Sequence, residues 1–233
     1  MKMNKPVVHS FYQSNIPQQM VETQAAVFDA LGIPLKQWKD DQATHCDWIN
    51  TILRDDGLGD VAVIADIDAF PLNVAGYARM VEQADTGALA GLAQVANHKD
   101  PTHIYAAPMF MAVRRSVYAT LGAPSMCRTK TTDVAQILTI KAEQAKVEVA
   151  LTYPTFAIRP RWPLADHGIY GIGSFYGENE FFHLFEARRT QTQKLFYAVA
   201  DGVISGRHNW LRYLEIMDQA PPSPKKKFLG LFR

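Results

Sequence analysis

Two aspartates separated by a single residue, Asp66 and Asp68, are the side chains that most directly suggest chemistry. They follow the apolar run 61–65, which is long enough for a strand buried on both faces. In open α/β sheets, ligands bind in the crevice beyond the carboxyl ends of the strands. Mg²⁺ and Mn²⁺ are usually held by one or two carboxylates together with substrate phosphates. The pair therefore predicts a site for Mn²⁺ or Mg²⁺. The alternative is a strand that ends in two solvated aspartates, because so short a motif often occurs by chance.

A histidine and an arginine late in the chain could complete such a site. His183 stands among aromatic residues, where a histidine is more often a hydrogen-bonded core residue than a ligand. The aspartate pair, however, leaves coordination positions free for an imidazole, so we predict His183 as a third metal ligand beside Asp66 and Asp68. Arg188 follows shortly after it. Arg189 is its neighbour, and because a guanidinium donates two parallel hydrogen bonds, we expect one of the two, assigned as Arg188, to contact the diphosphate of a bound nucleotide.

The first strand and the helix before the aspartates offer further ligand-facing residues. A strand expected over 6–12 contains His9 and ends at Tyr12, and its end could meet the base and ribose of a nucleotide. A half-buried strand end is the plainer interpretation. His45 stands near the start of a helix expected over 43–53, which leads into the acidic strand. A lone histidine there is usually a surface or capping residue, and the alternative is a contact to the nucleotide.

Pro108 and Asp133 lie on two later elements. Pro108 interrupts the apolar run 104–113, and proline is confined to the edges and bulges of sheets. Such a break often leaves small residues and free backbone groups facing a pocket, so we expect Pro108 to line the donor site. Thr132 or Asp133 is a good N-cap for a helix that begins near residue 131, and capping is the plainer interpretation of Asp133.

The elements that must position these residues alternate between strands and helices, which indicates an α/β fold. Apolar residues at helical spacing predict helices in 16–31, 43–53, 72–81, 116–121 and 210–217. Strands are expected in 6–12, 34–38, 61–65, 104–113 and 147–151, while 87–95 fits a strand or a buried helix start. Residues 157–176 are rich in proline, glycine and aromatic residues, which predicts a long loop that covers the ligand.

Composition limits the classes of function. The 233 residues are 48% hydrophobic and 20% charged, which is ordinary for a globular protein, and we expect a single domain over 1–220. A net charge of +1 does not provide the excess of basic residues that is typical of nucleic-acid-binding proteins. The sequence has no apolar run long enough for a transmembrane helix and no apolar signal peptide at its start. Two cysteines, Cys46 and Cys127, make neither a disulfide framework nor a zinc pattern, so we expect a cytoplasmic protein.

Residues 221–233 change composition sharply, with prolines followed by three lysines and a short apolar stretch. A flexible tail is the plainer interpretation. The alternative is a weak peripheral contact with anionic lipid at the inner membrane face, because polybasic and aromatic residues add to one another at such a surface.

Taken in order, these features resemble a small glycosyltransferase of the GT-A class, whose D-x-D motif ends a strand and holds a metal on a nucleotide-sugar diphosphate. The resemblance covers residues 6–217 and depends on Asp66-Ile67-Asp68, with looser matches at the strand around Pro108 and at a late histidine. It implies a Rossmann-like, mixed, mostly parallel sheet with helices on both faces. It also implies transfer of a sugar from a UDP- or GDP-linked donor to an acceptor that the sequence does not identify. Asp133 stands where some members carry the catalytic base or an acid that binds the acceptor.

Two other families share the short motif. Haloacid-dehalogenase-like phosphatases carry D-x-D-x-[TV] after an apolar strand and would use Asp66 as the nucleophile, but Phe70 occupies the Thr or Val position. Y-family polymerases carry D-[MI]-D-A-F, which residues 66–70 match, but no later S-x-D-E motif follows. A non-catalytic domain that binds a nucleotide sugar is the third alternative.

Overall fold

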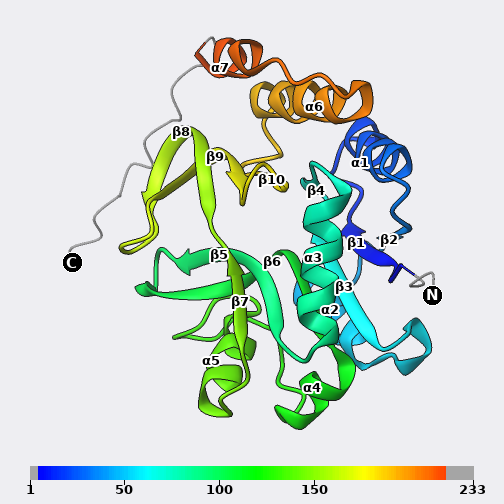
Figure 1. The fold of residues 1–233 in the computed structure, drawn as a ribbon, viewed down its shortest axis with the longest axis vertical. Coiled ribbons are helices and arrows are strands. Elements are labelled where there is room, and N and C mark those ends of the chain that lie inside the picture. Colours follow the sequence, from blue (N-terminus) through cyan, green and yellow to red (C-terminus); the bar gives the residue numbers. More distant parts are fainter. Residues whose placement is uncertain (1–4, 219–233) are drawn as a thin grey trace.

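A six-stranded mixed sheet forms the centre of the molecule (Figure 1). The computed structural model describes residues 5–218. The strand order is β2-β1-β3-β6-β5-β7, and β6 runs against both of its neighbours while the other pairs are parallel. The strands are β1 Val8–Tyr12, β2 Leu35–Lys39, β3 Val61–Asp66, β5 Leu89–Ala96, β6 Asp100–Arg114 and β7 Val149–Thr152. The predicted α/β architecture around a mixed sheet is confirmed.

Helices cover both faces of this sheet because the side chains of each strand alternate between two hydrophobic cores. In β3, Val63 and Ala65 face one core, while Ala62 and Ile64 face the other. On the first side lie the helices α1 Gln18–Ala30 and α3 Val74–Asp85. On the second side lie α2 His45–Arg54, α4 Arg115–Thr120 and α5 Gln136–Gln144.

A second, wholly antiparallel sheet packs against the first core, with the order β4-β10-β9-β8. Its strands are β4 Ala69–Pro71, β8 Pro154–Pro163, β9 Ile169–Tyr176 and β10 Phe181–Leu184. The prediction of a long loop over 157–176 is therefore wrong, because most of that segment forms the β8–β9 hairpin. The prolines of β8 are tolerated since β8 is an edge strand, where not every N–H is needed for the ladder. Two helices, α6 Thr190–Ser205 and α7 Trp210–Asp218, complete this part of the fold (Figure 1).

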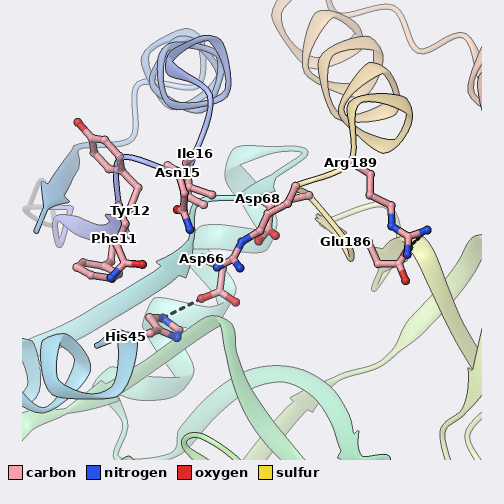
Figure 2. Close-up of a pocket in the computed structure, with 13 residues that line it drawn as sticks. Phe11, Tyr12, Asn15, Ile16, His45, Asp66, Asp68, Glu186 and Arg189 are labelled. Atoms are coloured by element: carbon pink, nitrogen blue, oxygen red, sulfur yellow. Dashed lines mark ion pairs between the residues drawn. The ribbon is translucent and has the colours of Figure 1, made fainter. Parts of the chain in front are cut away.

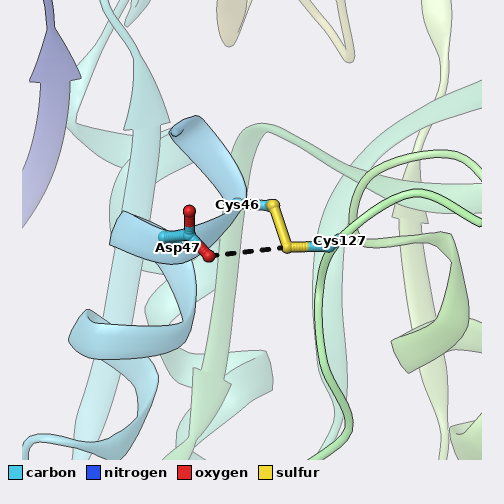
Figure 3. A group of neighbouring side chains, drawn as sticks. All are labelled: Cys46, Asp47 and Cys127. Carbon is cyan, nitrogen blue, oxygen red and sulfur yellow. Dashed lines mark hydrogen bonds between the residues drawn. A yellow bond between two sulfur atoms is a disulfide. The ribbon is translucent and has the colours of Figure 1, made fainter. Parts of the chain in front are cut away.

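The two cysteines form a disulfide, Cys46–Cys127, which the sequence analysis did not anticipate. Their separation of 81 residues gives no local signal. They meet because α2 and the segment between α4 and α5 pack on the same face of the central sheet. Figure 3 shows the bond between the start of α2 and that segment, with the Asp47 carboxylate 3.9 Å from the Cys127 sulfur. Since disulfides are rare in the cytosol, the cysteines give no support to a cytoplasmic location.

Across residues 5–218, every helix is too short or too polar to cross a membrane. The tail predicted for residues 221–233, with its proposed lipid contact, lies outside the described residues.

Candidate metal and nucleotide site

The Asp66-Ile67-Asp68 segment lies where the chain passes from the central sheet to the second sheet. Asp66 is the last residue of β3, at the carboxyl end of the strand, and its backbone lies beside Phe11 of the parallel strand β1. Asp68 lies in the turn that leads directly into β4. This is the kind of position, beyond the ends of parallel strands, where α/β folds bind ligands.

Strand β10 brings His183 to the same turn. His183 is paired with Ala69 of β4, and the neighbouring Leu184 N–H donates to the Asp68 carbonyl at 2.9 Å. The His183 Nε2 atom lies 3.3 Å from the Asp68 Oδ1 atom. One ligand atom from each of Asp66, Asp68 and His183 lies within 4.8 Å of the others. The three residues that the sequence singled out as metal ligands are thus brought together from three different elements.

A buried glutamine of α1 holds the main chain of this turn in place. Gln24 is fully buried, and its Nε2 atom donates to the carbonyls of Asp66 at 2.8 Å and Ala69 at 2.9 Å. Its Oε1 atom accepts a hydrogen bond from Gln37 of β2 at 3.0 Å. Gln24 thereby spans both ends of the acidic turn. This role was not predicted, because a lone glutamine at a helical position usually faces solvent.

His45 supports Asp66 from the first turn of α2. Its Nε2 atom lies 3.1 Å from Asp66 Oδ1, and its ring stacks on Phe11 and Trp48 with centroids 6.1 Å and 5.8 Å away. Burial alone would lower the pKa of His45, but the Asp66 carboxylate outweighs it and raises this pKa. Burial alone would raise the pKa of Asp66, but the charge and hydrogen bond of the facing His45 outweigh burial and lower this pKa. Each of the two groups thus favours the charged form of the other.

The larger of two adjoining cavities, about 520 Å³, opens above these acids. Figure 2 shows Tyr12 and Asn15 on one side, Glu186 and Arg189 on the other, and the two aspartates between them. Tyr12 and Arg188 both line this cavity, as the sequence predicted for a nucleotide site, and the Arg188 side chain is exposed.

A second cavity of about 270 Å³ shares His45, Asp66, Asp68 and Glu186 with the first. Its further lining residues include Gln94, Tyr105, Pro108, Asp133 and His183. Asp66 and Asp68 therefore line both a wide cavity that contains two arginines and a smaller one to which Asp133 adds a further acid.

Pro108 lies in this smaller cavity because β6 bulges there. The partner of Gly91 is Met111, whereas the partner of the next residue, Leu92, is Ala107. Three residues beginning at Pro108 are thus left out of the β5–β6 ladder, which is a position that proline tolerates.

Asp133 reaches the smaller cavity from the segment before α5. Its predicted role as an N-cap is wrong, because α5 begins at Gln136 and its N-cap residue is Ala135, with φ of +65°. The Asp133 carboxylate instead accepts the N–H of Val134 at 2.9 Å. Nearby, the pKa of the Tyr105 hydroxyl is raised well above its usual value by burial and by the Asp133 charge, so this phenol stays protonated.

His9 does not belong to the site. It is 2% exposed, lines neither cavity, and its Nδ1 atom accepts a hydrogen bond from Trp38 Nε1 at 3.1 Å. Burial lowers the pKa of His9 to about 4, with the positive charge of Arg115 as a smaller cause. The prediction of His9 as a nucleotide contact is therefore wrong, because its ring is buried against Trp38 of β2 inside the sheet.

Glu186 is the main site residue that sequence reasoning missed. It lines both cavities, and its carboxylate pairs with Arg161 at 2.5 Å and with Arg189 at 3.1 Å. Its backbone has a φ of +63°, an uncommon conformation for a residue with a side chain. A single glutamate in a polar segment carries no periodic signal, so only the folded chain reveals it.

No family model and no curated protein matches this chain. Among solved structures, the crystal structure of A197 from STIV aligns over 77% of this chain and 94% of that chain, with 8% sequence identity and a TM-score of 0.44. So weak a similarity carries no conclusion about this protein's function.

Proposed function

We propose that this protein is a metal-dependent glycosyltransferase with a GT-A-like fold, which moves a sugar from a UDP- or GDP-linked donor to an acceptor hydroxyl. The observation that carries the proposal is the position of Asp66, Asp68 and His183 between two adjoining cavities. A transferase needs this arrangement, since donor and acceptor must meet at one point.

The three clustered residues fit Mn²⁺ or Mg²⁺. Two carboxylates and an imidazole offer oxygen and nitrogen ligand atoms within 4.8 Å of one another, and the cavities leave room for phosphate oxygens and water. The other group of this kind in the described residues, Cys46, Asp47 and Cys127, does not fit, because both sulfurs are consumed in the disulfide. When bound, the cation would stabilise the negative charge that develops on the departing diphosphate.

The residues of the larger cavity fit the nucleotide half of the donor. Arg188 can donate paired hydrogen bonds to diphosphate oxygens. Tyr12 and Asn15 line the same cavity and offer an aromatic face and an amide for the base and ribose.

The smaller cavity fits the acceptor. Asp133 supplies a carboxylate in this cavity, which no arginine of residues 5–218 lines, and it can accept the proton of an attacking hydroxyl. Gln94 and the protonated Tyr105 can hydrogen-bond further hydroxyls of the acceptor. A base in this position is the arrangement that an inverting transferase requires.

A nucleotide-release assay tests the proposal. The protein would be incubated with UDP- and GDP-sugars and Mn²⁺, and free nucleoside diphosphate would be measured with and without simple sugar acceptors. We expect release that requires the metal and falls by at least 100-fold in Asp133→Asn, with donor binding retained. Turnover of an aryl phosphate that disappears in Asp66→Asn would instead support a phosphatase. Metal-dependent binding with no release from any donor would indicate a non-catalytic binding domain.

A further inference from the structure

The disulfide Cys46–Cys127 joins two elements that both contribute to the candidate site (Figure 3). Cys46 directly follows His45, which lines both cavities. Cys127 begins the segment 127–134, and this segment carries Asp133 into the smaller cavity. The bond therefore connects the helix beside the cation ligands with the segment that supplies the proposed base.

The two sides of the disulfide differ in how they are held. Helix α2 buries four apolar side chains against the central sheet, so it keeps its place without the bond. The segment 127–134 contains neither helix nor strand, and residues 128–131 are exposed one after another. The exposed Lys99 side chain donates to the carbonyls of Thr129 and Thr132, the second at 2.8 Å. Exposed hydrogen bonds of this kind open easily, so the disulfide is the strongest tie on this segment.

Both ends of the segment are fixed points. Met126, which precedes it, is fully buried, and its N–H donates to the side chain of Asn50 in α2 at 2.9 Å. Ala135, which follows it, is also fully buried, and its N–H donates to the Met126 carbonyl at 2.9 Å. Its φ of +65° is uncommon for a residue with a side chain, and the chain turns sharply there. Residues 127–134 therefore form a loop whose base is closed, as in the compact surface loops that often carry function.

We propose that Cys46–Cys127 is a reversible redox site, which a protein dithiol of the thioredoxin class reduces, and that its reduction releases the loop 127–134 from α2. The released loop carries Asp133 out of the smaller cavity. The three proposed cation ligands belong to other elements and keep their positions. Reduction would thereby switch off the transfer step and spare the binding of the donor. The effect on transfer rests on the proposed function, whereas the release of the loop does not.

Reduction proceeds by two exchanges at sulfur. A thiolate of the reductant attacks the Cys127 sulfur, a mixed disulfide forms, and Cys46 leaves as a thiolate. The second thiolate of the reductant then attacks its own partner sulfur in the mixed disulfide, and Cys127 leaves. Two electrons pass to the protein, the two protons of the reductant's thiols reach the cysteines through solvent, and the reductant ends as a disulfide.

The positions of the two sulfurs suit this reaction. Both cysteines are partly exposed, so a reductant can reach the bond. Cys46 is the better leaving group because it lies in the first turn of α2, where the N-terminal end of the helix stabilises negative charge on sulfur. The attack is therefore expected at Cys127, on the side of the loop that reduction releases.

Enzymatic reduction of the native protein tests the redox step. The folded protein would be mixed with thioredoxin, thioredoxin reductase and NADPH in the absence of denaturant. We expect one NADPH to be consumed for each protein molecule, and oxidised glutathione to restore the disulfide afterwards. The variant Cys46→Ser/Cys127→Ser should consume none.

Hydrogen exchange followed by mass spectrometry tests the release of the loop. On reduction, amide exchange in residues 127–134 should rise by at least about tenfold, while peptides from β8 and β9 should change by less than about twofold. The double serine variant should show the same rise without any reductant. Arg54→Gln is the matched control, because it removes a hydrogen bond from α2 to the Ala123 carbonyl at 3.3 Å and leaves the disulfide intact. Its oxidised form should exchange like the wild type.

Nucleotide release connects the loop with the proposed function. The reduced protein and the double serine variant should bind the donor with Mn²⁺ as the oxidised wild type does, and should turn over at least about tenfold more slowly, because the base is withdrawn. If the oxidised wild type itself releases no nucleotide from any donor, the transferase proposal fails, and hydrogen exchange still decides the redox site.

Three results would overturn the inference. The first is a native protein that consumes no NADPH, which would make the disulfide inaccessible to a protein dithiol. The second is equal exchange of residues 127–134 in the oxidised and reduced protein. The third is a rise in exchange throughout the chain on reduction, which would show that the bond stabilises the whole fold and does not act on the loop alone.

Discussion

Reduction of the Cys46–Cys127 disulfide should destabilise the protein strongly. The bond closes a loop with a sequence separation of 81 residues. In the chain-entropy description, a crosslink over a loop of about that length stabilises the folded state by about 4.5 kcal/mol. Measured effects of disulfides are commonly smaller, so we expect a loss of about 2–4 kcal/mol. That is a large fraction of the ~5–15 kcal/mol that stabilises a typical domain.

Urea unfolding, followed by tryptophan fluorescence with and without dithiothreitol, measures this loss. For a urea m-value of about 3 kcal/mol/M, the midpoint should fall by roughly 1 M on reduction. The double variant Cys46→Ser/Cys127→Ser is the control, and it should unfold at the lower midpoint whether or not reductant is present. Identical midpoints for the wild type in both conditions, or two titratable thiols in the oxidised protein after denaturation, would refute the reasoning.

Three further predictions concern single residues. The pKa of His9 is about 4 in the folded protein and near 6.5 when unfolded, so its contribution to stability should be complete above pH 6.5 and should fall by up to about 3 kcal/mol as the pH drops towards 4. In His9→Gln, urea midpoints measured across this pH range should depend less steeply on pH, and an unchanged slope would contradict the assignment. Gln24→Leu removes the side-chain donor to two backbone carbonyls, so it should cost about 1–3 kcal/mol in urea unfolding and weaken Mn²⁺ binding in calorimetry. The substitution Gln19→Leu, at an exposed position of the same helix, should do neither. In Gly76→Ala, the new Cβ would lie 2.6 Å from Glu180 Cβ, so we expect the free energy of unfolding to fall by about 1–3 kcal/mol, measured by thermal unfolding. An unchanged melting temperature would show that the Glu180 side chain moves aside freely.

Regular patterns in the sequence predicted much of the central sheet and its helices. The apolar run of β3 and the helical spacing of α1 and α2 each correspond to an element within a few residues of the expected bounds. The interruption at Pro108 corresponds to an irregular part of β6. These features are local, because a strand buried on both faces and an amphipathic helix each require a particular short-range pattern.

What the sequence did not predict depends on contacts between distant segments. The hairpin β8–β9 contains prolines that resemble loop punctuation, and only its place at a sheet edge makes them compatible with a strand. Helix α6 was not anticipated either, although its buried residues recur at helical spacing.

Distant packing also limited what could be predicted of the site. Asp66, Asp68 and His183 were chosen for their chemistry and lie together, but Gln24 and Glu186 required the fold to bring them there. Conversely, His9 was predicted as a site residue because it shares a strand with Tyr12, but it lies within the strand rather than at its end and is buried against Trp38.

Isothermal titration of UDP and GDP, each with and without Mn²⁺, tests the central claim most directly. We expect one of the two nucleotides to bind only when Mn²⁺ is present, and this binding to be lost in Asp66→Asn/Asp68→Asn while the fold, checked by circular dichroism, persists. Binding of neither nucleotide in the presence of Mn²⁺, or equal binding by the wild type and the double variant, would contradict it.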